Sequence, residues 1–226
     1  LVSKVPIVKQ AYLAGGTALA LHLGHRISAD LDFFTQQELD ENILASDLTR
    51  LKEFKKEGQA WRTVWGWVGK TKFSLFYYQY PLLAPTIPFE KISILDKPDI
   101  AAMKIQALGD RGTKRDFVDL FFLTKEYSLK ELLKFYNRKY GDLEEKSYHL
   151  VKSLDYFADA EVDELPKMLK SVSWEQVKQF FHQKSMALAK DLTESLPAEI
   201  LKDAKKEEAE AAKKKLEEGG AKVELK

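Results

Sequence analysis

The sequence contains no cysteine, which excludes disulfides, thiolate metal sites and a cysteine nucleophile. It also lacks an excess of either charge, because 36 Lys+Arg and 35 Asp+Glu leave a formal net charge of +1. Any polyanion site must therefore be local. The four histidines offer no set of three ligands, so we predict no zinc site. No apolar run approaches the roughly 18 residues of a membrane span, so we expect a cytoplasmic protein without a membrane partner.

The sequence also lacks an initiating Met and enters a motif-rich stretch soon after its start, so we expect an N-terminal helix to be missing from it. The 45% hydrophobic and 12% aromatic content is enough to bury a core in one or two domains.

The hydrophobic pattern predicts an α/β fold, with a mixed sheet and flanking helices followed by a mainly helical domain. The expected strands and helices of the sheet part are a strand at 11–14, a helix at 17–23, a strand at 30–34, a helix at 38–55, a hairpin of 61–68 with 72–80 that turns at Gly69-Lys70, and a strand at 91–95. Further helices are expected at 99–110, 114–125, 128–140, 143–157 and 173–193. We predict a sheet core at 1–96, a helical domain completing the cleft at 97–196 and a charged tail at 197–226.

Gly15, Gly16 and Thr17 lie between the first predicted strand and the helix that follows it. Glycines let the backbone approach a ligand closely, and a helix N-terminus offers free N–H groups to a phosphate. A tight connection without a ligand is the alternative explanation of the same residues.

Asp30 and Asp32 are two residues apart in the second predicted strand. The period of two places both carboxylates on one face, where they repel each other unless a cation compensates. Mg²⁺ takes oxygen ligands and commonly bridges carboxylates and substrate phosphates. We predict a Mg²⁺ (or Mn²⁺) site on these two residues, with a solvated strand edge as the alternative.

The segments 13–21 (LAGGTALAL) and 24–34 (GHRISADLDFF) together resemble the opening motif of the AbiEii/AbiGii toxin family of nucleotidyltransferases, within the DNA polymerase β-like superfamily. The resemblance implies that the Gly15-Gly16-Thr17 turn holds the triphosphate of an NTP and that the two aspartates carry the metal ions. It adds Arg26 and Ser28 as NTP-binding candidates, although Arg26 could equally hold its loop through a salt bridge.

A second group of charged residues spans two predicted helices. Lys104 and Arg111 share one edge of the first helix, and Arg115, Asp116 and Asp119 begin the second. By spacing alone, these residues are explained as well by a salt-bridged helical hairpin as by a ligand-binding site. The order of residues resembles the later motifs of the same family, which implies that Lys104 contacts the NTP phosphates and that Asp116 is an essential acid. Arg111 and Arg115 are candidate phosphate ligands because arginine suits phosphate or carboxylate, and Asp119 is expected to cap or bridge.

One departure from the superfamily concerns the general base. Many members place a third carboxylate on a later strand, whereas residues 72–77 (KFSLFY) contain none. Either Asp116 serves, or a subset of the usual ligands suffices. The aromatic residues of the hairpin can stack nucleobases, but we expect them to form sheet core.

The resemblance implies an enzyme of the EC 2.7.7 type that moves an NMP from an NTP to an acceptor hydroxyl, with an RNA or tRNA end as the expected acceptor. It also implies the toxin of a toxin–antitoxin or abortive-infection pair, with a cognate antitoxin as partner. The alternative is a catalytically silent relative that binds NTP or a partner.

Residues 187–226 resemble the end of the C-terminal domain of the bacterial ribosomal stalk protein. The first strand and the factor-binding helix of that domain have no counterpart, so we do not carry over ribosome binding. A fused segment, or convergence of an Ala/Glu/Lys-rich helix with a glycine stop, explains the likeness.

Overall fold

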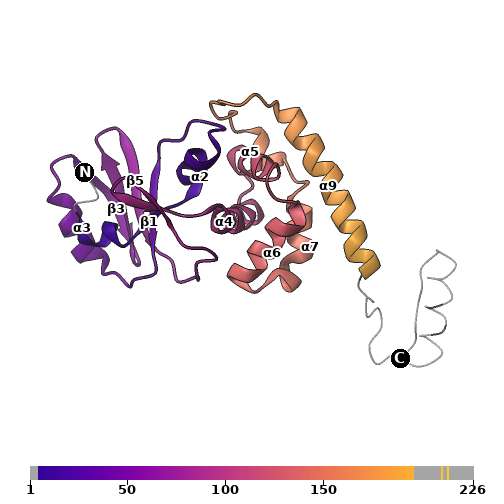
Figure 1. The fold of residues 1–226 in the computed structure, drawn as a ribbon, viewed down its shortest axis with the longest axis horizontal. Coiled ribbons are helices and arrows are strands. Elements are labelled where there is room, and N and C mark those ends of the chain that lie inside the picture. Colours follow the sequence, from indigo (N-terminus) through magenta and orange to yellow (C-terminus); the bar gives the residue numbers. More distant parts are fainter. Residues whose placement is uncertain (1–4, 196–209, 211–212, 214–226) are drawn as a thin grey trace. The chain divides into compact units, whose positions relative to one another are not determined.

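The computed structural model describes residues 5–195, 210 and 213. The chain divides into two units, Leu1–Ala187 and Leu188–Lys226, and the first contains a seven-stranded sheet in the order β3-β4-β5-β2-β1-β7-β6 (Figure 1). The strands are β1 (Tyr12–Leu13), β2 (Leu31–Thr35), β3 (Phe54–Ala60), β4 (Thr63–Val68), β5 (Thr71–Tyr77), β6 (Ile87–Phe89) and β7 (Ile92–Ile94).

The sheet is mixed, as predicted. The hairpins β3–β4 and β4–β5 are antiparallel, β5 runs parallel to β2, and β1 lies between antiparallel β2 and parallel β7. In the β2–β5 register Asp32 lies opposite Ser74 and Phe33 lies opposite Leu75. Because side chains alternate across a strand, Asp32 and Phe33 point to opposite faces of the sheet.

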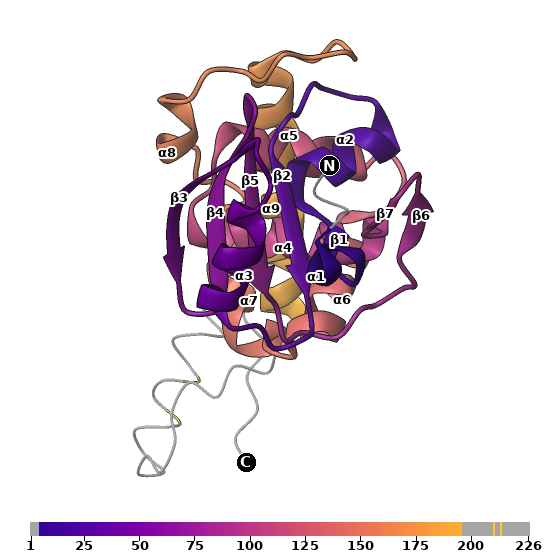
Figure 2. The same ribbon diagram turned by 90° about the vertical axis from the view of Figure 1, so that its left-hand side faces the viewer.

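Helix α3 (Glu41–Thr49) packs on the face that carries Phe33, whereas α2 (Gly15–Leu23) and α4 (Lys97–Asp110) lie on the other side of the sheet (Figures 1 and 2). Asp40 starts α3 by accepting hydrogen bonds from two backbone N–H groups of its first turn. The strand residues toward α3 are buried and apolar, and they form this part of the core with α3 residues Leu44 and Leu48.

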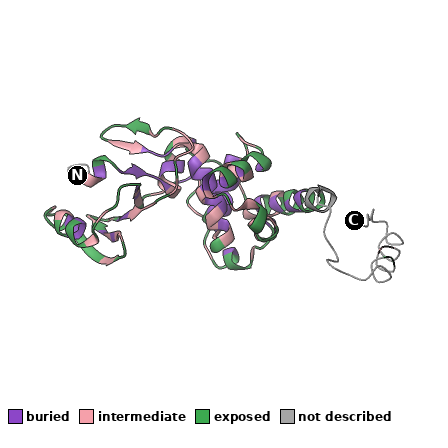
Figure 3. Ribbon diagram, turned by 90° about the horizontal axis from the view of Figure 1, so that it is seen from below, coloured by how far each residue is buried: buried purple, intermediate pink, exposed green. Residues whose placement is uncertain are grey.

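The helical part comprises α5 (Lys114–Leu123), α6 (Leu129–Tyr140), α7 (Leu143–Ser153), α8 (Ala158–Glu161) and α9 (Trp174–Ser195), with the short α1 (Pro6–Lys9) near the start of the chain. Ser128 and Glu131 form a capping box at the start of α6, and Gly141 ends that helix in the left-handed conformation. Figure 3 shows buried segments where strands and helices pack together and exposed segments along the outer turns.

The predicted helix over 38–55 is wrong beyond Thr49, because residues 54–60 form β3. This strand is a polar edge strand with a register shift between Lys56 and Gly58, so it lacks the clean alternation of a half-buried strand. The proline-rich loop also contains a short strand, β6, whose Pro88 is accommodated at the sheet edge.

The expectation of an aromatic sheet core holds for part of the hairpin only. Phe73 is fully buried, whereas the side chains of Trp61 and Trp67 are 71% and 40% exposed. In the described part of the chain, no helix combines the length and hydropathy of a membrane span. The predicted boundaries at 96/97 and 196/197 stay predictions, and nearly all of the predicted tail, 197–226, lies outside the described residues, as do residues 1–4.

Candidate active site

The start of α2 lies beside the carboxylate of Asp32. Gly15 begins the helix with φ +64°, and a Cβ placed on it would lie 3.5 Å from Asp32 Oδ2. The N–H of Ala14 donates to the carbonyl oxygen of Asp32 at 2.9 Å, which fixes the glycine turn against β2. The predicted strand–turn–helix–strand unit is therefore present, with both glycines in the first turn of the helix.

Asp30 and Asp32 lie close enough to interact electrostatically. Asp32 is half-buried on β2, and Asp30 is exposed one residue before the strand begins. Burial, followed by the negative charge of Asp30, raises the pKa of Asp32, while the hydrogen bond with Ser74 and the charges of Lys104 and Arg111 oppose the rise. Ionisation of both aspartates together is therefore unfavourable without a compensating cation.

Two hydroxyls of the predicted NTP-binding set shape the loop between α2 and β2. Thr17 Oγ1 lies 2.9 Å from Ser28 Oγ and 2.5 Å from the carbonyl oxygen of Asp30. These contacts hold the segment that carries Asp30 against the first turn of α2. Thr17 and Ser28 therefore have a positioning role that sequence reasoning did not assign to them.

Arg26 forms a bidentate ion pair with Asp119 of α5. Its Nε and Nη2 donate to Asp119 Oδ1 and Oδ2 at 2.7 and 2.9 Å, and both side chains are buried. A Cβ on Gly16 would lie 2.3 Å from Arg26 Nη2, so only glycine leaves room for this guanidinium. The salt-bridge alternative for Arg26 is the arrangement observed, and Asp119 bridges as expected.

Asp119 gathers two further donors. Its Oδ1 lies 2.8 Å from His25 Nε2, and its Oδ2 lies 2.6 Å from Lys104 Nζ. Burial opposes ionisation of Asp119, but Lys104, Arg26 and His25 hold its pKa far below the usual range. Sequence reasoning considered the histidines only as metal ligands and assigned no role to His25. Its partner Asp119 lies 94 residues away, so no local pattern indicates the contact.

Asp116 is also buried and fully engaged. Lys104 Nζ donates to its Oδ1 at 2.9 Å, while Arg111 Nε and Thr113 Oγ1 donate to its Oδ2 at 3.1 and 2.5 Å. Burial would raise the pKa of Asp116, but the charges of Lys104 and Arg111 and the hydrogen bonds lower it to about 2. The geometry favours a positioning role for this acid, since every donor nearby stabilises its charged form.

The four cations of the predicted NTP-binding set occupy different environments. Arg26 and Lys104 are buried among carboxylates, whereas the Arg111 side chain is 64% exposed and its charge interacts with that of Asp32. Arg115 is exposed on α5 and forms no ion pair within the described residues. Arg111 is therefore the cation that combines accessibility with nearness to Asp32.

A segment after α8 braces the loop that carries Arg26. Ile27 N–H donates to the carbonyl oxygen of Lys167 at 2.8 Å, and Leu169 N–H donates to that of His25 at 2.8 Å, around an isolated bridge between Arg26 and Met168. Sequence reasoning missed this contact, because no local pattern pairs residues so far apart.

The donor chemistry at Asp30 and Asp32 fits a hard divalent cation. The negative charges of the two carboxylates repel each other, and neither carboxylate forms an ion pair in the described part of the chain. No group of three or more His, Asp or Glu side chains is assembled for a metal among the described residues. Ser74 stands opposite Asp32, so the neighbouring strand adds a hydroxyl where a third carboxylate was sought.

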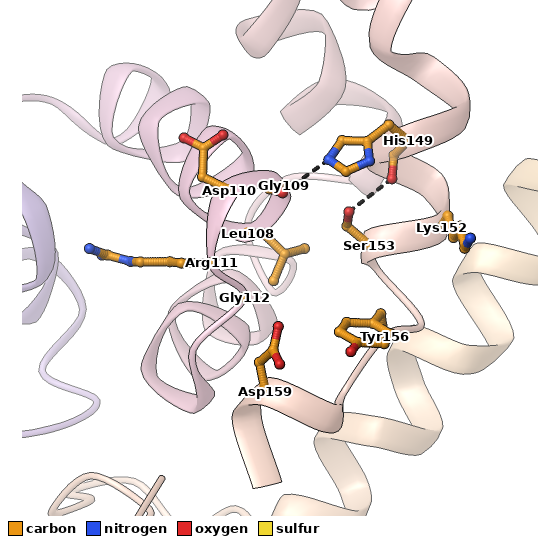
Figure 4. A pocket seen from close by; sticks show the side chains of 10 residues that line it. All are labelled: Leu108, Gly109, Asp110, Arg111, Gly112, His149, Lys152, Ser153, Tyr156 and Asp159. Atoms are coloured by element: carbon orange, nitrogen blue, oxygen red, sulfur yellow. Dashed lines mark hydrogen bonds between the residues drawn. The ribbon is translucent and has the colours of Figure 1, made fainter. Parts of the chain in front are cut away.

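The pocket in Figure 4, of about 260 Å³, lies at the end of α4 and against α7. Arg111 is the one predicted site residue that lines it, and His149 Nε2 lies 3.0 Å from the carbonyl oxygen of Gly109 there. The pocket thus adjoins the charged cluster without containing the two aspartates.

Two family models match the chain. The model described as nucleotidyl transferase AbiEii toxin, type IV toxin–antitoxin system, covers residues 2–81, and that of the ribosomal protein L7/L12 C-terminal domain covers residues 175–226. The uncharacterized protein aq_aa25 of Aquifex aeolicus is 38% identical over 185 residues, which are 79% of this chain and 87% of that protein. Protein bL12 of Corynebacterium kroppenstedtii is 68% identical over 38 residues, 17% of this chain and 30% of that protein.

Solved structures share the fold. MenT4, a nucleotidyltransferase toxin of Mycobacterium tuberculosis H37Rv, superposes with a TM-score of 0.57 at 16% identity, covering 88% of this chain and 80% of that one. JHP933 of Helicobacter pylori gives 0.50 at 23% identity, covering 84% and 90%. These structures confirm the predicted fold class, and the match to the nucleotidyl transferase AbiEii model supports the predicted enzyme class. Residues 2–81 thus match the AbiEii family of nucleotidyltransferase toxins, and the chain carries an L7/L12-like segment at its C-terminal end.

Proposed function

We propose that the protein transfers an NMP from an NTP to the hydroxyl of an RNA, with Mg²⁺ or Mn²⁺ as cofactor. The observation that carries the proposal is the position of Asp32 against the first turn of α2. The negative charge of Asp30 lies close enough to raise the pKa of Asp32. A helix start that favours anions beside two carboxylates that favour cations suits a metal-bound triphosphate.

The chain's own groups divide the work of binding the triphosphate. Backbone N–H groups at Gly15 and Gly16 face the phosphates, and the exposed guanidinium of Arg111 adds positive charge from the side of α4. Lys104 is buried between Asp116 and Asp119, and its positive charge lowers the pKa of Asp32. It therefore contributes positive potential at the site without being exposed. Arg26, Thr17 and Ser28 hold the loop that presents Asp30.

A divalent cation held by Asp30 and Asp32 would neutralise the triphosphate and stabilise the attacking and leaving oxygens. The acceptor hydroxyl forms the new bond to the α-phosphorus, the bond to the β-phosphate oxygen breaks, and pyrophosphate leaves with that electron pair. The proton of the acceptor hydroxyl leaves to water, because Asp30 and Asp32 would be occupied by the cation and the charges of Lys104 and Arg111 lower the pKa of Asp116 to about 2.

The biological part of the proposal follows from the family. As an AbiEii-type toxin, the protein would act in the cytoplasm on an RNA needed for growth, with a tRNA end as the first acceptor to test, and a cognate antitoxin would restrain it.

The test incubates the protein with each α-labelled NTP, Mg²⁺ and total bacterial RNA, beside the Asp30→Ala variant. Label in an RNA band that the variant abolishes supports the proposal and names the nucleotide. Undiminished labelling by Asp30→Ala contradicts the metal-site assignment.

A catalytically silent relative is the second function to consider, because Ser74 stands where a third carboxylate was sought. NTP binding that depends on Mg²⁺, without release of pyrophosphate in the presence of any RNA, would favour it over the enzyme.

A further inference from the structure

The face of the sheet that carries Asp32 continues across β5, β4 and β3. Asp32 pairs with Ser74, Ser74 with Trp65, and Trp65 with Gly58, so these four residues form one row. Residues directly opposite each other share a face of the sheet. A Cβ on Gly58 would lie 2.3 Å from the Trp65 ring, so the indole packs directly against β3 at Gly58. The row therefore runs from the carboxylate to an aromatic platform.

The next row on the same face consists of Lys55, Trp67 and Lys72, which pair across β3, β4 and β5. All three side chains are exposed, and Trp67 lies between the two lysines. Asp30 precedes Leu31, the partner of Phe73, by one residue, so Asp30 lies level with Lys72. The two rows together join a cationic, aromatic surface to the two carboxylates of the site.

The positive charge of this region is local. Residues 52–72 contain six Lys or Arg and two Glu, in a protein with a formal net charge of +1. Lys55, Lys70 and Lys72 form no ion pair within the described residues, so their charges stay available to a ligand. An exposed tryptophan flanked by unpaired lysines favours a ligand with both phosphates and flat bases.

We propose that the Lys55–Trp67–Lys72 row binds the single-stranded RNA segment next to the acceptor hydroxyl. Trp67 stacks on a base, the two lysines contact phosphates on either side, and the strand leads across Trp65 and Ser74 toward Asp32. Two strand spacings and one row separate Trp67 from Asp32, about 12 Å, which the last nucleotides of an RNA can span. This inference rests on the proposed function and specifies where the acceptor lies.

Neighbouring features argue against other occupants. A second copy of the chain would bring the same lysines against each other, which costs free energy. A packed apolar helix would bury Lys55 and Lys72 beside Trp67 without partners. RNA satisfies both the charges and the ring.

The experiment measures binding of a short fluorescent single-stranded RNA to the full-length protein by anisotropy, without NTP. We expect Trp67→Ala to weaken binding at least about fivefold, because a base loses its stacking partner. The double variant Lys55→Ala/Lys72→Ala should weaken binding to a similar extent, because two phosphate contacts are lost. Loss of two phosphate contacts should also lower the salt slope by about 1.4. Trp67→Phe should restore most of the affinity that Trp67→Ala loses.

The same hairpin supplies matched controls on the other side of the sheet. Lys56 pairs with Gly66 and so points to the opposite face, and Trp61 packs against Tyr77, whose side chain is also on that face. Lys56→Ala and Trp61→Ala should bind RNA like the wild type. Equal affinity of all variants, or equal losses in the controls, would overturn the assignment of this face.

Transfer assays separate this inference from the proposed function. With the enzyme active, the row variants should raise the KM for RNA and leave the KM for NTP unchanged. Wild-type transfer with unaltered RNA KM in the row variants would overturn the row alone. Absence of transfer by the wild type would overturn the function, while RNA binding that depends on the row would still support the surface.

Discussion

Arg26 and Asp119 meet in a buried, bidentate ion pair, with N–O distances of 2.7 and 2.9 Å, although 93 residues separate them. The pair ties the loop that leads to Asp30 and Asp32 to helix α5. Because Asp119 also accepts from Lys104, the loop, α4 and α5 share one carboxylate. The position of Asp30 and Asp32 relative to Lys104 and Arg111 therefore depends on Asp119, a residue outside the proposed NTP-binding set.

Asp119→Ala is expected to destabilise the protein by about 3–5 kcal/mol, because it leaves Arg26 and Lys104 charged, buried and short of a partner. Urea unfolding followed by circular dichroism measures the loss. Asp47 pairs with exposed Arg50, so Asp47→Ala should cost less than about 1 kcal/mol. Similar midpoints for the two variants would contradict the central place of the Asp119 cluster.

Gly16→Ala is expected to displace the Arg26 guanidinium, since the new Cβ would lie 2.3 Å from Nη2. We expect both a lower unfolding midpoint and at least a tenfold loss of kcat/KM, about 1.4 kcal/mol in the transition state. Gly24→Ala is the control, because Gly24 has φ +55° with nothing within 4 Å, and there only backbone strain of about 1–2 kcal/mol arises. If Gly16→Ala retains full activity, the close packing of Arg26 on this turn is unimportant for catalysis.

Arg111→Ala and Arg115→Ala separate two arginines that the family resemblance treats alike. Arg111 interacts in charge with Asp32, so its loss should raise the KM for NTP about tenfold, or about 1.4 kcal/mol. Arg115→Ala should leave the KM unchanged. Steady-state pyrophosphate release measures both, and a larger effect at Arg115 would move the phosphate site along α5.

The pH dependence of stability should differ between Asp32 and Asp116. A raised pKa means that folded Asp32 holds its proton more tightly than the unfolded chain, so its contribution to stability falls as pH rises past 3.8. Asp32→Asn should therefore be more stable than the wild type at neutral pH without metal, and the difference should vanish in acid. Asp116, with a pKa of about 2, contributes stability above pH 3.8 that is lost as pH falls toward 2.

Urea unfolding in chelator-treated buffer across this range tests both signs. A wild type more stable than Asp32→Asn at neutral pH would mean that Asp32 has a cationic partner in the folded protein.

Local sequence patterns predict a large part of this fold. The glycine turn before α2, the hairpin turn at Gly69-Lys70 and the Pro98 start of α4 are each written in a few adjacent residues, and the structure has all three. Strand β3 was not predicted, because Lys55, Lys56 and a register shift break the alternation of apolar and polar residues. Its strand conformation is fixed by pairing with β4.

The candidate site divides in the same way. Asp30, Asp32 and the glycines stand in one contiguous motif, so their nearness could be predicted from a strand period and a helix start. The contacts of Asp119 with His25, and of Asp32 with Ser74, join segments that only the tertiary fold brings together. Contacts that depend on strand register or on long-range ion pairs therefore could not be predicted from local sequence patterns.

The most direct measurement compares α-labelled with γ-labelled NTP in the presence of Mg²⁺ and acceptor RNA, using wild type and Asp32→Asn. We predict that the wild type transfers the α label to RNA and releases the γ label in pyrophosphate, and that Asp32→Asn does neither. Transfer of the γ label to RNA, or α-label transfer that survives in Asp32→Asn, would contradict nucleotidyl transfer at this site.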